Sequence, residues 1–245
     1  MYPGQARVDV HMSADWNEKH ILLKVAFPLS AHADMATYEI PYGSIQRPTT
    51  RNNPRELAMF EVPALRWADL SDATHGFALM NASKYGYDCK GNVLRLSLLR
   101  SPTWPDPHAD EGHHEFTYSI LPHAGGWKDA GIVRQAYQLN YPLIAFQTDA
   151  HAGELPAQQT FFSADAPNVV ITAVKKAEDD DGIIVRWYEW AGKQTTVNLK
   201  LPRAAASVSA TNLLEQKEES LTPAGDMVAV PTKPYEIKTV KVTFQ

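Results

Sequence analysis

Cysteine is nearly missing from this chain of 245 residues, in which Cys89 is the only one. A single thiol cannot form an internal disulfide, and chains that need no disulfide are typical of a reducing cytoplasm. An apolar run of about 20 residues, the length that crosses a bilayer, is missing as well. The first residues lack the apolar core of a signal peptide. These absences predict a cytoplasmic protein that has no contact with a membrane.

A basic surface is also missing. The chain has 23 lysines and arginines against 28 aspartates and glutamates, which gives a formal net charge of −5, and the basic residues form no cluster. Binding of nucleic acid needs a basic stripe, so no nucleic-acid partner is expected. With 44% hydrophobic and 21% charged residues, the composition is ordinary for a globular protein. The length allows one large all-β domain or two smaller ones.

Alternation of apolar and polar residues is abundant. Residues 94–98 alternate leucine with Arg95 and Ser97, and residues 116–120 repeat the pattern with phenylalanine, tyrosine and isoleucine. A period of two is typical of half-buried strands. Turn signals such as 90–92 (KGN) break the runs at short intervals. We therefore predict an all-β fold: a large antiparallel β-sandwich, supersandwich-like, with one short helix, followed by a smaller C-terminal β-sandwich.

One segment departs from this pattern. Residues 127–140 (WKDAGIVRQAYQLN) carry apolar side chains at helical spacing, so we expect a helix of about three turns. Residues 147–168 are polar and irregular, as in a connector that contains one short strand. A boundary there gives a first domain at 1–164 and a second at 165–245 with about five strands. The acidic run 178–182 predicts a solvated hairpin tip, and no further ligand spacing supports a calcium loop.

Arg100 is the first candidate site residue, in a segment where a loop follows a strand and binding groups often concentrate. Regular alternation places it on the same face as the leucines of 94–98, where a guanidinium is costly unless it is paired. The carboxylates of Asp106, Asp110 and Glu115 follow shortly after it. An arginine in this position can hold a carboxylate or a polar ligand. Alternatively, Arg100 leaves the sheet at the strand end and reaches water.

Residues 108–115 (HADEGHHE) contain six side chains of the kinds that bind metals. Zinc sites use such residues. His113 and His114 are adjacent, so on a strand they point to opposite faces, and alternation joins His114 to the face of Phe116 and Tyr118. A local metal site and simple hydrogen bonding at a strand end both remain open, and we assign no metal ligand.

Aromatic side chains accompany these acids. Residues 85–88 (YGYD) predict a tight turn that displays two rings, and Trp104 lies between two prolines. Exposed rings beside carboxylates suit sugars, although the same rings can plug the edge of a sandwich. The sequence contains no Gly-x-Ser-x-Gly elbow and no glycine-rich phosphate loop, so no complete catalytic set is present. Several acids can form a catalytic pair, but spacing selects none: Asp88, Asp106, Asp110 and Glu115.

Long unbroken runs carry a family resemblance: 36–48 (ATYEIPYGSIQRP), 75–79 (HGFAL), 83–88 (SKYGYD), 91–102 (GNVLRLSLLRSP) and 114–118 (HEFTY). With these runs the chain resembles the C-terminal β region of the family 38 glycoside hydrolases, the α-mannosidases, and most of all their cytosolic-type branch. The likeness covers residues 6 to about 145 strongly and the remainder weakly. Runs of this length are far more specific than a four-residue motif.

The resemblance implies a retaining α-mannosidase that hydrolyses terminal α-mannosides with an aspartate nucleophile and a zinc ion. In the family these groups lie in an N-terminal α/β barrel, which is the expected partner of this chain together with a mannose-containing carbohydrate. The β region is then non-catalytic and walls the cleft, with no cofactor of its own. Arg100 resembles the family arginine that approaches the substrate, and Asp106, Asp110 and His114 are the other candidate substrate-binding residues.

Two other functions compete with this one. The chain can be a free-standing carbohydrate-binding module, or a metal-dependent hydrolase built on 108–115. A region detached from its barrel should expose a contiguous apolar patch of more than about 400 Å². A free-standing lectin-like module should instead show a groove lined by exposed rings and hydrogen-bonding groups.

Overall fold

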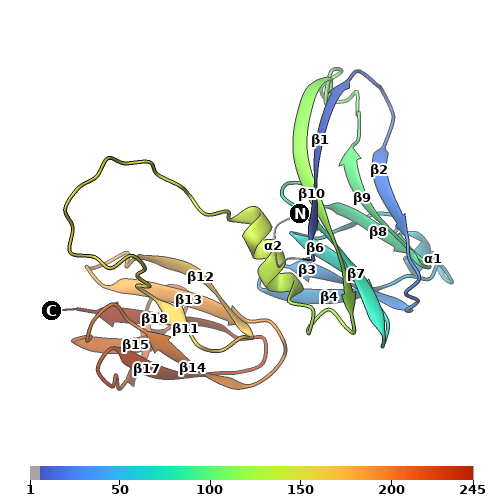
Figure 1. The fold of residues 1–245 in the computed structure, drawn as a ribbon. Helices are drawn as coiled ribbons and strands as arrows, with labels where there is room; N and C mark the ends of the chain where they lie inside the picture. The colour runs from blue at the N-terminus through green and yellow to red at the C-terminus, as the bar shows by residue number, and fades with distance from the viewer. Residues whose placement is uncertain (1–5, 245) are drawn as a thin grey trace. The chain divides into compact units, whose positions relative to one another are not determined.

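The computed structural model describes residues 6–244 and divides the chain into two compact units, Met1–Ala145 and Phe146–Gln245. Both units consist of antiparallel sheets (Figure 1), which confirms the all-β prediction. The boundary predicted at 164/165 differs from this division and falls just after β11 (Ser163–Ala164), which pairs with a strand of the second unit. In the part of the chain that the structure describes, no helix has the length and apolarity needed to span a membrane.

The larger sheet of the first unit has six strands in the order β1-β10-β7-β6-β3-β4. The strands β1 and β10 pair along the full length of β1, so Asp15 lies opposite His113 and Ala14 lies opposite His114. The N-terminal strand is thereby fixed beside the loop that precedes β10. The six strands are β1 (Val8–Trp16), β10 (Gly112–Ala124), β7 (His75–Asn81), β6 (Trp67–Ser71), β3 (Met35–Ile40) and β4 (Gly43–Pro48).

The smaller sheet of the first unit has four strands in the order β2-β9-β8-β5. These strands are β2 (Leu23–Pro28), β9 (Val93–Leu99), β8 (Gly86–Lys90) and β5 (Val62–Pro63). Apolar side chains from both sheets, such as Leu70 and Leu96, belong to one buried cluster. Two sheets that share a core through alternate residues form a β-sandwich, as the alternation in the sequence predicts.

Two helices accompany this sandwich. The short helix α1 (Pro54–Leu57) follows the Asn53 N-cap, and the longer helix α2 (Ile132–Asn140) packs on β6 and β7. The helix predicted at 127–140 therefore exists but begins later. Gly131 takes a left-handed conformation with φ of +68° at the N-cap, and the residues before it form a turn. Glycine adopts this conformation without steric cost, so it sets the start of the helix.

The prediction that 85–88 displays two rings is wrong for one of them. Tyr85 is 54% exposed, but Tyr87 is fully buried, because it already belongs to β8 and its ring lies in the core. The Tyr87 hydroxyl accepts a hydrogen bond from Asn81 Nδ2 at 2.6 Å. A buried phenol needs such a partner, so this ring stabilises the sandwich rather than a ligand.

The second unit has a five-stranded sheet in the order β12-β13-β18-β15-β16 and a three-stranded sheet in the order β11-β14-β17. Valines and leucines of both sheets surround the buried ring of Trp187. About five strands were predicted after residue 165, and the described residues 166–244 form seven. The bounds are β12 (Val169–Lys176), β13 (Ile183–Glu189), β14 (Thr195–Lys200), β15 (Ser207–Thr211), β16 (Lys217–Leu221), β17 (Met227–Thr232) and β18 (Ile237–Thr243).

Candidate functional site

All four predicted site residues lie on the loop between β9 and β10 or at the start of β10. Asp110 anchors this loop, because its Oδ2 accepts hydrogen bonds from the backbone N–H of Ser101 at 2.9 Å and of Arg100 at 3.1 Å. Its backbone has a φ of +64°, which turns the chain back toward the strand end. The bond from Ser101 holds the pKa of the Asp110 carboxyl below its usual value. A charged carboxylate that accepts two backbone hydrogen bonds thus closes the loop.

Arg100 leaves the sheet at the strand end and reaches water, the second of the two interpretations of the sequence, and does not lie on the leucine face. The pairing of β2 with β9 shifts register between Leu23 and Lys24, so Leu98 and Leu99 are both buried although they are neighbours. A bulge of this kind breaks the period of two. Arg100 follows the strand end and is exposed. Its guanidinium makes no hydrogen bond or ion pair with any residue in the described range 6–244.

His114 braces the same loop from β10. Its Nε2 donates to the backbone oxygen of Asp110 at 2.8 Å. The neighbouring His113 contacts Asp15 instead, through Nδ1 at 2.8 Å, and lies near Glu115 at 3.5 Å. The hydrogen bond to Asp15 raises the pKa of His113. The two adjacent histidines therefore serve different faces, as expected for consecutive residues of a strand.

Asp106 shapes the tip of the loop. Its Oδ1 accepts a hydrogen bond from the backbone N–H of His108 at 2.9 Å. His108 Nδ1 in turn lies 2.8 Å from Oε2 of Glu111, whose other oxygen is 3.2 Å from Lys19 Nζ. Polar side chains of this loop thus bond to one another or to neighbouring residues. Among the residues that the structure describes, no three histidine, cysteine, aspartate or glutamate side chains form a group that could hold a metal ion.

Trp104 is the most exposed ring of this loop, with 84% of its surface accessible. The loop beneath it is fixed to the N-terminal segment, because Trp16 Nε1 donates to Ser101 Oγ at 2.7 Å and the backbone N–H of His20 donates to the Ser101 oxygen at 2.9 Å. The result is a braced loop that presents one exposed ring and one exposed guanidinium. Such a pair can contact a polar ligand or a facing protein surface.

The buried acid Asp88 has a structural role. It is fully buried, and it contacts Lys24 Nζ at 2.6 Å and Arg95 Nη2 at 2.5 Å. A second buried acid, Asp69, contacts His123 Nε2 at 2.8 Å. Burial alone lowers the pKa of His123, but the bond and charge of Asp69 raise it on balance. These pairs stabilise the sandwich, and the carboxylates of Asp88 and Asp69 are occupied by them.

A feature that the sequence analysis missed is the apolar character of the connector, residues 141–162, which runs from α2 to β11 without helix or strand (Figure 1). In the sequence, the prolines, glycine and polar residues of this segment obscure the pattern of several large apolar side chains. These side chains are strongly exposed: Tyr141 67%, Leu143 100%, Ile144 80%, Phe146 86%, Leu155 76% and Phe161 54%. Exposed apolar clusters of this kind mark surfaces that contact another protein.

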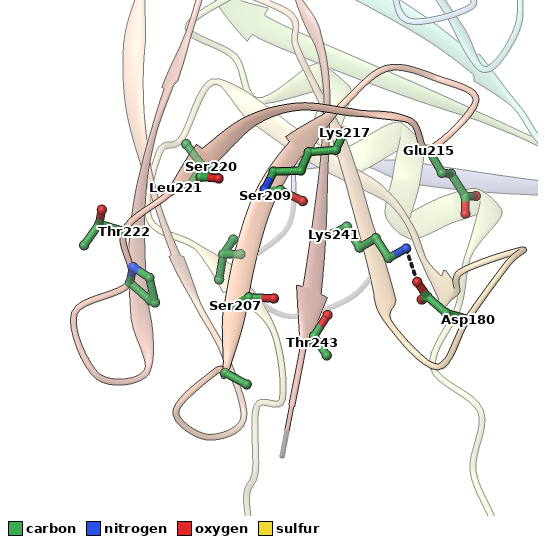
Figure 2. A pocket seen from close by; sticks show the side chains of 13 residues that line it. Asp180, Ser207, Ser209, Glu215, Lys217, Ser220, Leu221, Thr222, Lys241 and Thr243 are labelled. Carbon is green, nitrogen blue, oxygen red and sulfur yellow. Dashed lines mark hydrogen bonds and ion pairs between the residues drawn. The ribbon is translucent and has the colours of Figure 1, made fainter.

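A second feature that the sequence did not indicate is a pocket of about 530 Å³ in the second unit (Figure 2). Its lining combines short hydroxyl side chains with charged side chains and a few apolar ones, mostly from β15, β16 and β18. Polar strands of this type give a weak sequence signal, because their hydroxyls also suit any solvated surface. The hydroxyl and charged residues of the lining are Asp180, Ser207, Ser209, Glu215, Lys217, Ser220, Thr222, Lys241 and Thr243.

Two family models match the chain. Residues 1–108 match the glycosyl hydrolases family 38 C-terminal domain, and residues 168–240 match the glycosyl hydrolases family 38 C-terminal beta sandwich domain. Together they confirm the resemblance seen in the sequence.

Among curated proteins, alpha-mannosidase 2C1 of Homo sapiens is 38% identical over 99% of this chain. Alpha-mannosidase G of Dictyostelium discoideum is 40% identical over 97% of it. The chain spans only 24% and 22% of these two relatives, about a quarter of their length. A solved structure of a glycosyl hydrolase family 38 protein from Enterococcus faecalis has the same fold, with a TM-score of 0.84 and 20% identity over 100% of this chain and 29% of that one.

Proposed function

The chain belongs to glycosyl hydrolase family 38, as part of its C-terminal region, and from this membership we propose that it is the non-catalytic β region of a retaining α-mannosidase. In this proposal it packs against an upstream catalytic part of the same polypeptide and helps to wall the cleft in which terminal α-mannosides are hydrolysed. The names and lengths of the curated relatives support an upstream part, because this chain spans only about a quarter of them.

The observation that carries the proposal is the exposed connector. Leu143, Ile144 and Phe146 are each at least 80% exposed and lie within four consecutive positions. Burying one such side chain stabilises a protein by roughly 1.5–3 kcal/mol, so leaving all three in water is unfavourable. A surface of the upstream part that covers them gives these side chains the burial they lack in the isolated chain.

The braced loop is our candidate for the wall of the cleft. Asp106, Asp110 and His114 hold its shape through hydrogen bonds within the loop. Arg100 and Trp104 project from it into solvent. We propose that Arg100 reaches the substrate as a directional donor, and that the other three predicted residues act through the position of the loop.

Zinc belongs to the proposal for the complete enzyme and is assigned to the upstream part. In residues 6–244 no group of three suitable ligands forms, and side chains of 108–115 are engaged in pairs such as His108 with Glu111. These residues do not fit a zinc site. A metal-dependent hydrolase built on 108–115 is therefore not favoured.

A docking experiment tests the proposal. The upstream part of the polypeptide is produced separately and titrated with this chain, with calorimetry as the readout. We expect the triple change Leu143→Ser, Ile144→Ser and Phe146→Ser to weaken association at least a hundredfold, since each lost contact is worth about 1 kcal/mol or more. The double change Leu213→Ser and Leu214→Ser, at exposed leucines of the second unit, is the matched control. Equal affinities for both variants, or no association of the unaltered chain, would contradict the proposal.

We also propose a cytoplasmic location. Cys89 is buried, and burial raises the pKa of its thiol to about 12. A thiol that stays protonated is unreactive, which suits a protein that keeps its cysteine reduced.

The alternative function, a free-standing carbohydrate-binding module, calls for a groove lined by rings and hydrogen-bonding groups. The pocket of the second unit offers hydrogen-bonding groups, but none of the described residues that line it is aromatic. It fits an accessory site better than an independent lectin.

A further inference from the structure

We propose that the hydroxyl-lined pocket of the second unit binds an uncharged saccharide unit, independently of the catalytic role proposed above. The pocket lies on the face of the five-stranded sheet that points away from the core. On β15, Ser207, Val208 and Ser209 all border the pocket, and Val208 also belongs to the buried core cluster. Successive residues of a strand point to opposite faces, so the same sequence that packs the core also builds the pocket floor.

Short side chains in cross-strand register explain why the sheet is hollow here. Ser209 lies opposite Ser220 of β16 on one side and Lys241 of β18 on the other, and Ser207 lies opposite Thr243. Bulkier side chains in place of Ser207, Ser209 and Ser220 would fill the space above them. The resulting hollow has a volume of about 530 Å³ and is open to solvent.

A bulge in β16 brings Lys217 to the same pocket. Ala210 pairs with Glu219 and Thr211 pairs with Lys217, so Glu218 is left without an opposite residue. In a regular strand Lys217 and Ser220 would point to opposite faces. Because of the bulge both of them line the pocket, and re-aiming a side chain is a recurrent use of such bulges.

Three of the charged groups that line the pocket, Asp180, Glu215 and Lys241, are held in place. The ammonium of Lys241 forms an ion pair with the carboxylate of Asp180, as Figure 2 shows. Glu215 contacts Lys175 at 2.8 Å and accepts a hydrogen bond from the backbone N–H of Glu178 at 2.9 Å. Both carboxylates are thereby fixed before a ligand arrives, and pre-positioned groups lose little entropy on binding.

The balance of charge selects the class of ligand. The lining carries two lysines, Lys217 and Lys241, and two acids, Asp180 and Glu215, so it favours neither an anion nor a cation. Sugar hydroxyls both donate and accept hydrogen bonds, which matches a wall of serines and threonines with ammonium donors and carboxylate acceptors. Lys217 makes no ion pair with a residue in the described part of the chain, so its ammonium can donate to the ligand. Without a ring to stack on, the affinity should be weak, with Kd on the order of 1–10 mM.

Nuclear magnetic resonance of the isotope-labelled 245-residue chain tests this assignment. The probe is mannotriose, added up to about 50 mM so that a millimolar Kd can be fitted. We expect saturable shifts of the backbone amide signals of Ser207, Ser209 and Lys217. Ser209→Leu fills the pocket and should abolish them, whereas Thr196→Leu, at an exposed position of β14, should leave them unchanged.

A second variant keeps the test decisive if Ser209→Leu disturbs the fold. Lys217→Ala should weaken binding about tenfold, as expected for one lost hydrogen bond to a charged group, while Lys200→Ala on β14 should leave Kd unchanged. The assignment is wrong if the unaltered chain shows no saturable shift, or if the pocket variants bind as well as their controls. It is also wrong if sulfate moves these signals and mannotriose does not. Because the readout is binding to this chain alone, the result is separate from the docking test.

Discussion

The two units follow the same alternation of apolar and polar residues but treat buried charge differently. In the first unit, buried acids pair with cationic side chains, as Asp88 does with Lys24 and Arg95. In the second unit, the buried acid Glu189 accepts hydrogen bonds from the backbone N–H groups of Ala191 and Gly192, at 2.7 and 2.8 Å. Glu189 also accepts hydrogen bonds from the backbone N–H of Tyr235 at 2.9 Å and from Asn168 Nδ2 at 2.8 Å. Its donors are thus neutral groups, whereas the donors to Asp88 are charged side chains. The first unit is therefore the more vulnerable to the loss of a single charge.

The largest expected effect is on the stability of the first unit. Asp88→Ala leaves Lys24 and Arg95 without their buried partner, and removing one member of a buried pair costs about 3–5 kcal/mol. Urea unfolding followed separately in each unit measures this loss. Asp181→Ala is the matched control in the second unit, where the aspartate is 98% exposed beside Lys176; it should cost less than about 1 kcal/mol. Similar losses for both variants would break the contrast between the units.

The next effect concerns activity in the complete enzyme. Arg100→Ala should lower kcat/KM by about tenfold to a thousandfold, the range that one lost directional contact gives. Arg203→Ala, at an exposed arginine of the second unit, should leave it unchanged. Kinetics with an aryl α-mannoside separate the two variants. If Arg100→Ala kept full activity, Arg100 would be only a surface residue.

A smaller effect is expected at the anchor of the loop. Asp110→Ala removes the acceptor of two backbone hydrogen bonds, from Arg100 and Ser101, which should cost the first unit about 1–2 kcal/mol. Hydrogen exchange at these two amides should become faster, while exchange in β9 stays slow. Unchanged protection of both amides would show that Asp110 does not brace the loop.

The smallest effect is a dependence on pH. Asp69 raises the pKa of His123 in the folded state above its ordinary value of 6.5, so the pair stabilises the first unit fully below that pH and loses its contribution as the pH rises through the folded pKa. From pH 6 to pH 8.5 we expect a decline of less than about 1 kcal/mol from this pair. His123→Gln should remove this decline. An identical pH profile for the variant would contradict the role of the pair.

The sequence was sufficient to predict the fold class, the strands with apolar alternation and the family. It was insufficient where tertiary pairing overrides a local pattern. The register shift opposite Leu23 and Lys24 turns Arg100 out of the leucine face, and a bulge leaves little trace in one sequence. The five strands predicted after residue 165 were 169–174, 183–190, 195–201, 227–230 and 235–244. The strands β15 and β16 were not among them, because serine, glutamate and lysine dominate their exposed positions. Residues 147–168 were predicted to be polar, and no role was assigned to Leu143, Ile144 and Phe146 just before them, because a sequence does not show which apolar side chains stay exposed.

The most direct test of the central claim, that this chain supplies a wall and not the reaction, is an assay of the chain alone. Incubated with an aryl α-mannoside and added zinc, it should give no turnover, whereas the same chain joined to its upstream part should be active. Turnover by the isolated chain that disappears with a chelator would contradict the account.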